Sequence, residues 1–137
     1  MILPITLTIA GAAALLNLWL AIRVGNVRMS AKIDLGDGGN ERLSRRMRAH
    51  SNFSEFTPIV LILLGLIEMT VGQSLWLWLA GGIYILARIS HAFGMDGKMK
   101  ARQIGIIATF LITLILAVGA LALPYFTVVS VGGTLPS

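Results

Sequence analysis

The sequence predicts an all-α integral membrane protein folded as a four-helix bundle. The first observation is composition: 56% of the residues are hydrophobic and 12% are charged, about half the charged share of a soluble domain. The second is the presence of four long apolar runs, and the third is that the cations fall between those runs. The 137 residues predict one domain, residues 1–137.

The first and fourth apolar runs are long enough to cross a membrane unaided. They cover residues 2–22 and about 104–129, and a spanning helix needs about 20 apolar residues. The two middle runs, about 56–72 and 75–87, are shorter, so their polar flanks must belong to the same helices. The predicted helices are about 2–23, 41–72, 74–94 and 102–128.

Three connections join these helices. The short segment 72–74 makes the second and third helices antiparallel neighbours, and residues 95–98, MDGK, predict a tight turn. The long connection is 23–44; its GDGGN stretch at 36–40 lacks the GK[ST] ending of a phosphate-binding loop and predicts a flexible turn. Asn40 is a suitable cap for the start of the second helix.

The cations predict the orientation of the chain. All 11 lysines and arginines lie between the first and second helices or around the third connection. By the positive-inside rule this side is cytoplasmic, so both termini face the non-cytoplasmic side. The membrane surface accounts for the net charge of +5, and no nucleic-acid partner is expected. With no cysteine and no metal-ligand spacing around His50 and His91, no metal is expected.

A polar stripe runs from the start of the second helix into its apolar part. At about 100° per residue, Arg48, Asn52 and Glu55 fall within roughly 60° of one another, and Arg45 lies on the same side. Pro58 predicts a kink just beyond the stripe. Ionisable groups at membrane depth are costly and usually face a bundle interior or a wet cavity. Two interpretations are open: an Arg48–Glu55 ion pair bridged by Asn52 for packing, or a pocket for a small zwitterionic or anionic ligand.

A second polar cluster is predicted at the same end of the membrane. Tyr84, Arg88, His91 and Met95 are spaced 4-3-4 and share one face of the third helix. Taken alone, Tyr84 and Arg88 fit interface anchoring or snorkelling, and His91 fits a buried hydrogen-bonding residue. Arg102 begins the fourth helix. Two polar clusters that meet on one side favour a site over either cluster alone.

These motifs resemble those of a known family, MAPEG, the membrane-associated proteins of eicosanoid and glutathione metabolism. The segment RAHSNFSEFTP, 48–58, resembles its signature, approximately R-A-x-x-N-x-x-E-x-x-P, and every named element is present. The segment ARISHAFGM, 87–95, followed by Arg102, looks like the matching part of the third and fourth helices. The resemblance covers essentially the whole chain. The GDGGN stretch resembles the small bacterial branch, which implies a bacterial inner membrane.

The resemblance implies a homotrimer that binds glutathione between neighbouring subunits near the cytoplasmic face. The implied reaction is transfer of glutathione, a co-substrate, to hydrophobic or lipid-derived electrophiles, with glutathione peroxidase activity as a further implied reaction. Carried over by position, the glutathione-binding residues are Arg48, Asn52, Glu55, His91, His50 and a helix-one arginine, Arg28 or Arg23. Arg102 matches an arginine that activates the thiol, which makes it the catalytic candidate.

The chemistry of glutathione fits these residue types. Arginines bind carboxylates through bidentate hydrogen bonds, a glutamate binds an ammonium, and a cation near the sulfur stabilises the reactive thiolate without a metal. Phe56 and Met95 stand where the family often has tyrosine, so a thiol-assisting hydroxyl is missing. The alternative is therefore a non-catalytic glutathione-binding or structural membrane trimer. A small exporter is disfavoured because the first helix carries no acid.

Overall fold

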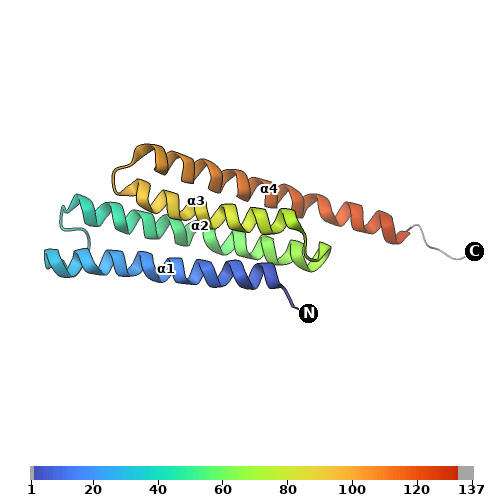
Figure 1. The fold of residues 1–137 in the computed structure, drawn as a ribbon, viewed down its shortest axis with the longest axis horizontal. Helices are drawn as coiled ribbons and strands as arrows, with labels where there is room; N and C mark the ends of the chain where they lie inside the picture. The colour runs from blue at the N-terminus through green and yellow to red at the C-terminus, as the bar shows by residue number, and fades with distance from the viewer. Residues whose placement is uncertain (1, 133–137) are drawn as a thin grey trace, which may run out of the picture.

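The structure is a computed structural model that describes residues 2–132 of the chain. Within these residues the chain forms four α-helices and no strand (Figure 1). The helices are α1 (Pro4–Ala31), α2 (Glu41–Val71), α3 (Leu75–Met95) and α4 (Met99–Gly132). Each of the four contains a stretch long and apolar enough to cross a membrane, which confirms the predicted all-α membrane bundle.

Consecutive helices run antiparallel along the long axis of the molecule (Figure 1). α2 and α3 lie at the centre because each contacts every other helix, whereas no described residue of α1 contacts α4. The α1–α2 connection and the α3–α4 turn lie at one end of the bundle. We call this the basic end, since it carries Arg42, Arg45 and Arg46 beside one connection and Lys98 and Lys100 beside the other. The sequence-based orientation of this end toward the cytoplasm stays a prediction.

α1 is longer than the sequence predicted. It continues past residue 23 to Ala31 and ends at Lys32, which adopts a left-handed conformation with a φ of 54° and donates its N–H to carbonyls of the last turn. The prediction assigned the cations after residue 23 to a loop. Arginine is a good helix former, however, and its long side chain can reach the surface from a helix end. The connection to α2 therefore shortens to residues 32–40.

α2 begins at the predicted cap. Asn40 Oδ1 accepts the N–H of Leu43 at 2.9 Å, which satisfies one of the free donors of the first turn. Gly38 and Gly39, just before it, adopt φ values of +55° and +76°, a region that glycine enters without strain. The helix then continues through Pro58, so the polar stripe and the apolar half belong to one element.

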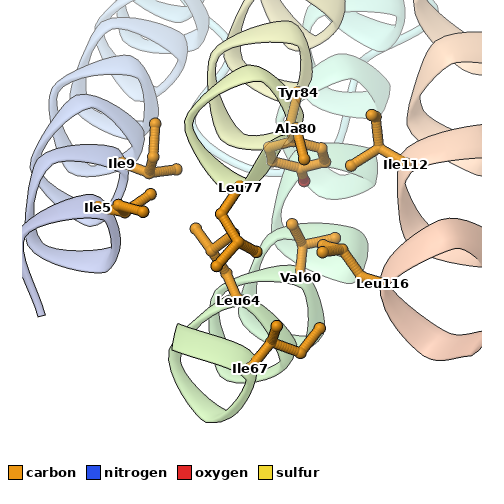
Figure 2. Packing of buried hydrophobic residues seen from close by; sticks show 10 residues of the cluster. All are labelled: Ile5, Ile9, Val60, Leu64, Ile67, Leu77, Ala80, Tyr84, Ile112 and Leu116. Carbon is orange, nitrogen blue, oxygen red and sulfur yellow. The ribbon is translucent and has the colours of Figure 1, made fainter. Parts of the chain in front are cut away.

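Apolar side chains from all four helices meet toward the end opposite the basic end (Figure 2). The buried members of this core are Ile5, Ile9, Val60, Leu64, Ile67, Leu77, Ala80, Tyr84, Ile112 and Leu116. A smaller cluster of Ala13, Leu16, Leu20, Phe53 and Ala92 continues toward the basic end. In lipid, close packing of such side chains contributes dispersion energy that holds helices together without exclusion of water.

α3 and α4 approach each other at backbone distance. A Cβ built on Gly105 would lie 2.6 Å from both the carbonyl oxygen of Ala87 and the nitrogen of His91. A Cβ on Gly94 would lie 2.1 Å from the nitrogen of Arg102. Small residues are therefore what permit this contact. The contact fixes the start of α4, including Arg102, beside the end of α3.

Glu68 of α2 closes the start of α1. Its carboxylate accepts the N–H of Ile5 at 2.9 Å, and the N–H and hydroxyl of Thr6 at 2.8 and 2.7 Å. The N-cap residue, Leu3, supplies no side-chain acceptor, so these backbone donors depend on the neighbouring helix. Because Glu68 is 2% exposed, it acts here as a buried structural cap.

Candidate functional site

The polar stripe of α2 lies on the outer surface of the bundle. The side chains of Arg48 and Glu55 are 68% and 49% exposed, and their Nη1–Oε1 distance of 3.7 Å makes a loose ion pair. Ser51, between them, donates to Glu55 Oε1 at 3.1 Å. Charged side chains on a spanning helix are costly against lipid. Contact of this exposed pair with lipid would be unfavourable, and no other part of the described chain shields it.

Asn52 turns from the stripe toward the interior. Its Oδ1 accepts a hydrogen bond of 2.7 Å from Arg88 Nη2. The predicted bridge by Asn52 between Arg48 and Glu55 is therefore not among the hydrogen bonds of the described residues. Since its oxygen is occupied by Arg88, the amide nitrogen of Asn52 remains available to donate to a ligand.

Arg88, which the sequence analysis placed in the second polar cluster but not among the glutathione-binding residues, is a buried residue of the site. It is 2% exposed, its Nη1 donates to Thr109 Oγ1 at 3.3 Å, and its guanidinium lies 5.9 Å from the Phe53 ring centroid. No carboxylate of the described residues lies within ion-pair distance of it. The snorkelling interpretation is wrong, because this face of α3 turns toward α2 and α4. Tyr84, also assigned to the interface, is fully buried and shares a 2.9 Å hydrogen bond with Thr57.

His91 lies on the same buried face of α3, in keeping with the 4-3-4 spacing. It is 3% exposed, and its Nδ1 has no hydrogen-bond partner among the described residues. A Cβ on Gly105 of α4 would lie 2.7 Å from the His91 Cβ, so α4 covers this side chain closely. The structure thus holds His91 inside the bundle while the Arg48–Glu55 pair is outside. Tyr84, Arg88, His91 and Met95, at the 4-3-4 spacing, are all buried on this face of α3. Their common spacing was the feature of the sequence that could have indicated burial of Arg88.

His50 points away from the stripe and toward α1. Its Nε2 lies 2.8 Å from Asn17 Oδ1, and this contact joins α2 to α1 near the outer surface. Within one chain, His50 does not join the Arg48 stripe.

The two candidate arginines of α1 are both engaged within the chain. Arg28 Nη1 donates to the carbonyl of Gly36 at 2.7 Å and so closes the α1–α2 connection. Arg23 is 8% exposed, donates to Asp96, and lies 4.6 Å from the Trp19 ring centroid. Neither arginine makes a hydrogen bond or ion pair with the stripe in the described residues.

Arg102 lies exposed at the start of α4 and lines a cavity of about 170 Å³. Arg45 of α2 and Met95 of α3 line the same cavity. The Arg102 guanidinium makes no ion pair with the described residues. The structure therefore brings the catalytic candidate to one end of the predicted stripe. Arg48 and Glu55 are not lining residues of this cavity.

A salt-bridge cluster at the basic end was not predicted from the sequence. Asp96 pairs with Arg23 of α1 and with Arg46 of α2, whose Nε lies 3.5 Å from Asp96 Oδ1. Arg46 Nη1 also donates to the Arg23 carbonyl at 3.1 Å. The cluster ties α1, α2 and the α3–α4 turn together. The sequence does show Asp96 in a predicted turn on the same side of the membrane as many arginines. It does not show which of those arginines pair with Asp96.

Comparison with known proteins agrees with this architecture. The MAPEG family model matches residues 6–122, which include most of all four helices. Two curated relatives are both named inner membrane protein YecN, from Escherichia coli strain K12 and from Escherichia coli O6:H1. Each is 27% identical over 110 residues, covering 80% of this chain and 84% of the relative. With the four apolar helices, these relatives confirm the prediction of a multi-pass bacterial inner membrane protein. Because the family model matches most of the length of this chain, the chain belongs to the MAPEG family.

Proposed function

We propose that this protein binds glutathione at the α2 stripe and transfers it to hydrophobic electrophiles that arrive through the bilayer. The observation that carries the proposal is the exposed Arg48–Glu55 pair on a membrane-spanning helix. A weakly paired arginine and glutamate match the carboxylate and the ammonium of a zwitterionic peptide. The Asn52 amide, held through its oxygen by Arg88, adds an oriented N–H donor.

The same exposure supports assembly into a homotrimer, the state that the family resemblance implies. A single chain leaves Arg48 and Glu55 open to its surroundings at membrane depth. A neighbouring copy that covers the stripe would turn an outer surface into a pocket and remove the charges from lipid. The surface contact between Asn17 and His50 is a further polar group for such a neighbour to cover.

Arg102 is the proposed catalytic residue. Its side chain is free of ion pairs within the described residues and faces a cavity at the end of the stripe. A cation near the glutathione sulfur would stabilise the thiolate, which is the reactive species, most strongly in a poorly hydrated site. The thiol releases its proton to water, the sulfur attacks the electrophilic carbon of the acceptor, a C–S bond forms, and the leaving group departs with its electron pair.

Two side chains favour a second candidate, a glutathione-binding protein without turnover. Met95 lines the Arg102 cavity, and Phe56 packs against Phe110 with ring centroids 5.5 Å apart. A thioether and a phenyl ring offer no hydroxyl to assist a thiol, although many family members carry tyrosine at these positions. Arg102 would then position the ligand without promoting its reaction.

The test uses the detergent-purified protein with glutathione and 1-chloro-2,4-dinitrobenzene, followed by absorbance of the conjugate. Arg102→Leu should lower the rate about a hundredfold, by analogy with loss of one group that stabilises developing charge. Lys100→Gln, which removes a neighbouring exposed cation, should leave the rate unchanged. Cumene hydroperoxide in place of the chlorinated ring tests the peroxidase reaction, which is followed by formation of glutathione disulfide because no conjugate is made.

Calorimetry with glutathione separates the two candidates. Binding without product would select the non-catalytic protein. No binding to the wild type, or binding unaltered in Arg48→Leu with Glu55→Leu, would reject the α2 stripe as the glutathione site.

A further inference from the structure

A cavity of about 370 Å³ opens at the basic end, and the geometry points to it as a binding site for phosphate esters. Its lining residues are Glu41, Arg42, Arg45, Arg46 and Asp96. The volume is that of about twelve water molecules, which is enough for a phosphate group and part of its ester. This cavity shares Arg45 with the Arg102 cavity but does not include Arg48, Glu55 or Arg102, and the inference does not rest on the proposed glutathione chemistry.

One side of the cavity has more cations than its carboxylate can neutralise. Asp96 is shared between Arg46 and the buried Arg23. Arg46 Nε is buried and makes no hydrogen bond within the described residues, although it lies 3.5 Å from Asp96 Oδ1. The Arg46 guanidinium therefore depends on a carboxylate that it shares with Arg23. An anion in the cavity would add negative charge beside these two arginines.

The other side of the cavity adds to the excess of positive charge. Arg45 pairs with Glu41 in an exposed contact, whereas Arg42 makes no ion pair with the described residues. Counting four arginines, including Arg23, against two carboxylates gives a net charge of +2 around the cavity. Glu41 begins α2, so the positive end of the dipole of a 31-residue helix adds to this potential.

The ligand class follows from the side chains and their position. Guanidinium groups bind phosphate oxygens through paired hydrogen bonds, and basic pockets at the ends of spanning helices suit anionic headgroups. The cavity lies in the first turns of α2 and at the turn after α3, beyond the apolar parts of both helices. The phosphodiester of an anionic phospholipid and a soluble phosphate ester share this chemistry, so the experiment has to separate them.

The experiment uses the full chain purified in mild detergent. Native mass spectrometry measures retention of phosphatidylglycerol against phosphatidylcholine, and a second arm measures calorimetric binding of glycerol phosphate at low salt. Arg42→Gln is the test variant, because Arg42 has no ion pair within the described residues whose loss would disturb folding. Lys98→Gln is the matched control, because it removes an exposed cation from the same end without altering the lining of the cavity.

We expect Arg42→Gln to weaken phosphate binding about tenfold, the effect of one charged hydrogen bond, and Lys98→Gln to have no such effect. This pattern in the phosphatidylglycerol arm identifies the lipid as the ligand, and the same pattern with glycerol phosphate alone identifies a soluble ester. Absence of binding in both arms, or equal losses in the two variants, overturns the inference. Displacement of the bound phosphate by glutathione also overturns it, because the cavity would then belong to the glutathione site.

Discussion

The side-chain amide of Asn52 is bonded at its oxygen and open at its nitrogen. Arg88 donates to Oδ1 at 2.7 Å, and among the described residues its guanidinium makes one other hydrogen bond, to Thr109. Because Arg88 is buried with no described carboxylate in ion-pair range, it depends on these neutral acceptors. Stability and ligand binding thus involve different atoms of Asn52, so substitutions can separate them.

Asn52→Leu should lower the free energy of unfolding by about 1–3 kcal/mol, because a buried guanidinium loses an acceptor. Asn52→Asp keeps an acceptor for Arg88 and should unfold at or above the wild-type temperature. The aspartate cannot donate, however, so glutathione affinity should fall in both variants. Thermal unfolding in detergent and calorimetry measure the two effects. Identical unfolding temperatures for Asn52→Leu and the wild type would contradict the stabilising role.

At the level of whole helices, the contact between α3 and α4 determines where Arg102 lies. Gly94 and Gly105 bring the two backbones so close that neither position has room for a methyl group. By comparison, a Cβ on Gly82, on α3, would have no heavy atom within 4 Å. The two kinds of glycine therefore offer a test of close approach with the same chemical change.

Gly105→Ala should push α4 away from α3 and destabilise the fold by about 1–3 kcal/mol, as for an overpacked core. The rate of glutathione conjugation should fall with it, because Arg102 moves with α4. Gly82→Ala should be neutral or stabilising by up to about 1 kcal/mol, since alanine is the better helix former. Thermal unfolding and the conjugation assay are measured together. Equal behaviour of the two alanine variants would show that the backbone contact is dispensable.

The helices were predictable from the sequence because their causes are local. Apolar runs, the Asn40 cap and the short segment 72–74 each act within a few residues. The end of α1 was missed because cations continue a helix as readily as they begin a loop. The partners of Arg88 and Glu68 were missed for a different reason: each is bonded to another helix, and spacing along one helix does not reveal what faces it.

The same limit applies to the site. The α2 spacing gave Arg48 and Glu55 a common side, but the expected bundle interior or wet cavity was not found, because this side is exposed in the single chain. The bridge by Asn52, one of the two open interpretations, does not form because Arg88 of α3 donates to its oxygen. The sequence had no means of showing that Arg102 shares a cavity with Arg45 and not with Glu55.

On the scale of the whole molecule, the two outer helices, α1 and α4, do not close the bundle against each other. α1 and α4 each contact the two central helices and, within the described residues, never each other. In this arrangement the Arg48–Glu55 pair of α2 stays exposed. The proposed covering of the stripe would come from neighbouring copies of the same chain, the assembly that the family resemblance implies.

Native mass spectrometry of the protein released from mild detergent should give a mass about three times the 14.7 kDa of one chain. The physical reason is that neighbouring copies cover the Arg48–Glu55 pair. Chemical crosslinking in native membranes provides the control against detergent artefacts. A monomer by both methods would contradict the proposed assembly.

The predicted orientation can be tested because the chain contains no cysteine. Leu35→Cys places a thiol in the α1–α2 connection, where Leu35 is 91% exposed, and Ile2→Cys places one at the opposite end. By the positive-inside rule, a membrane-impermeant maleimide should label Ile2→Cys in cells with a permeabilised outer membrane. Leu35→Cys should be labelled only after the inner membrane is opened. The reverse pattern would invert the topology.

The Glu68 carboxylate has a consequence for motion. Sliding α1 along α2 by one turn would strip this acid of three donors and leave it facing hydrocarbon. The end of the bundle that holds the chain start is thus pinned. The basic end is held by the Asp96 ion pairs, but water can replace those contacts there, so motion of the helices that admits a large ligand should be greatest at the basic end.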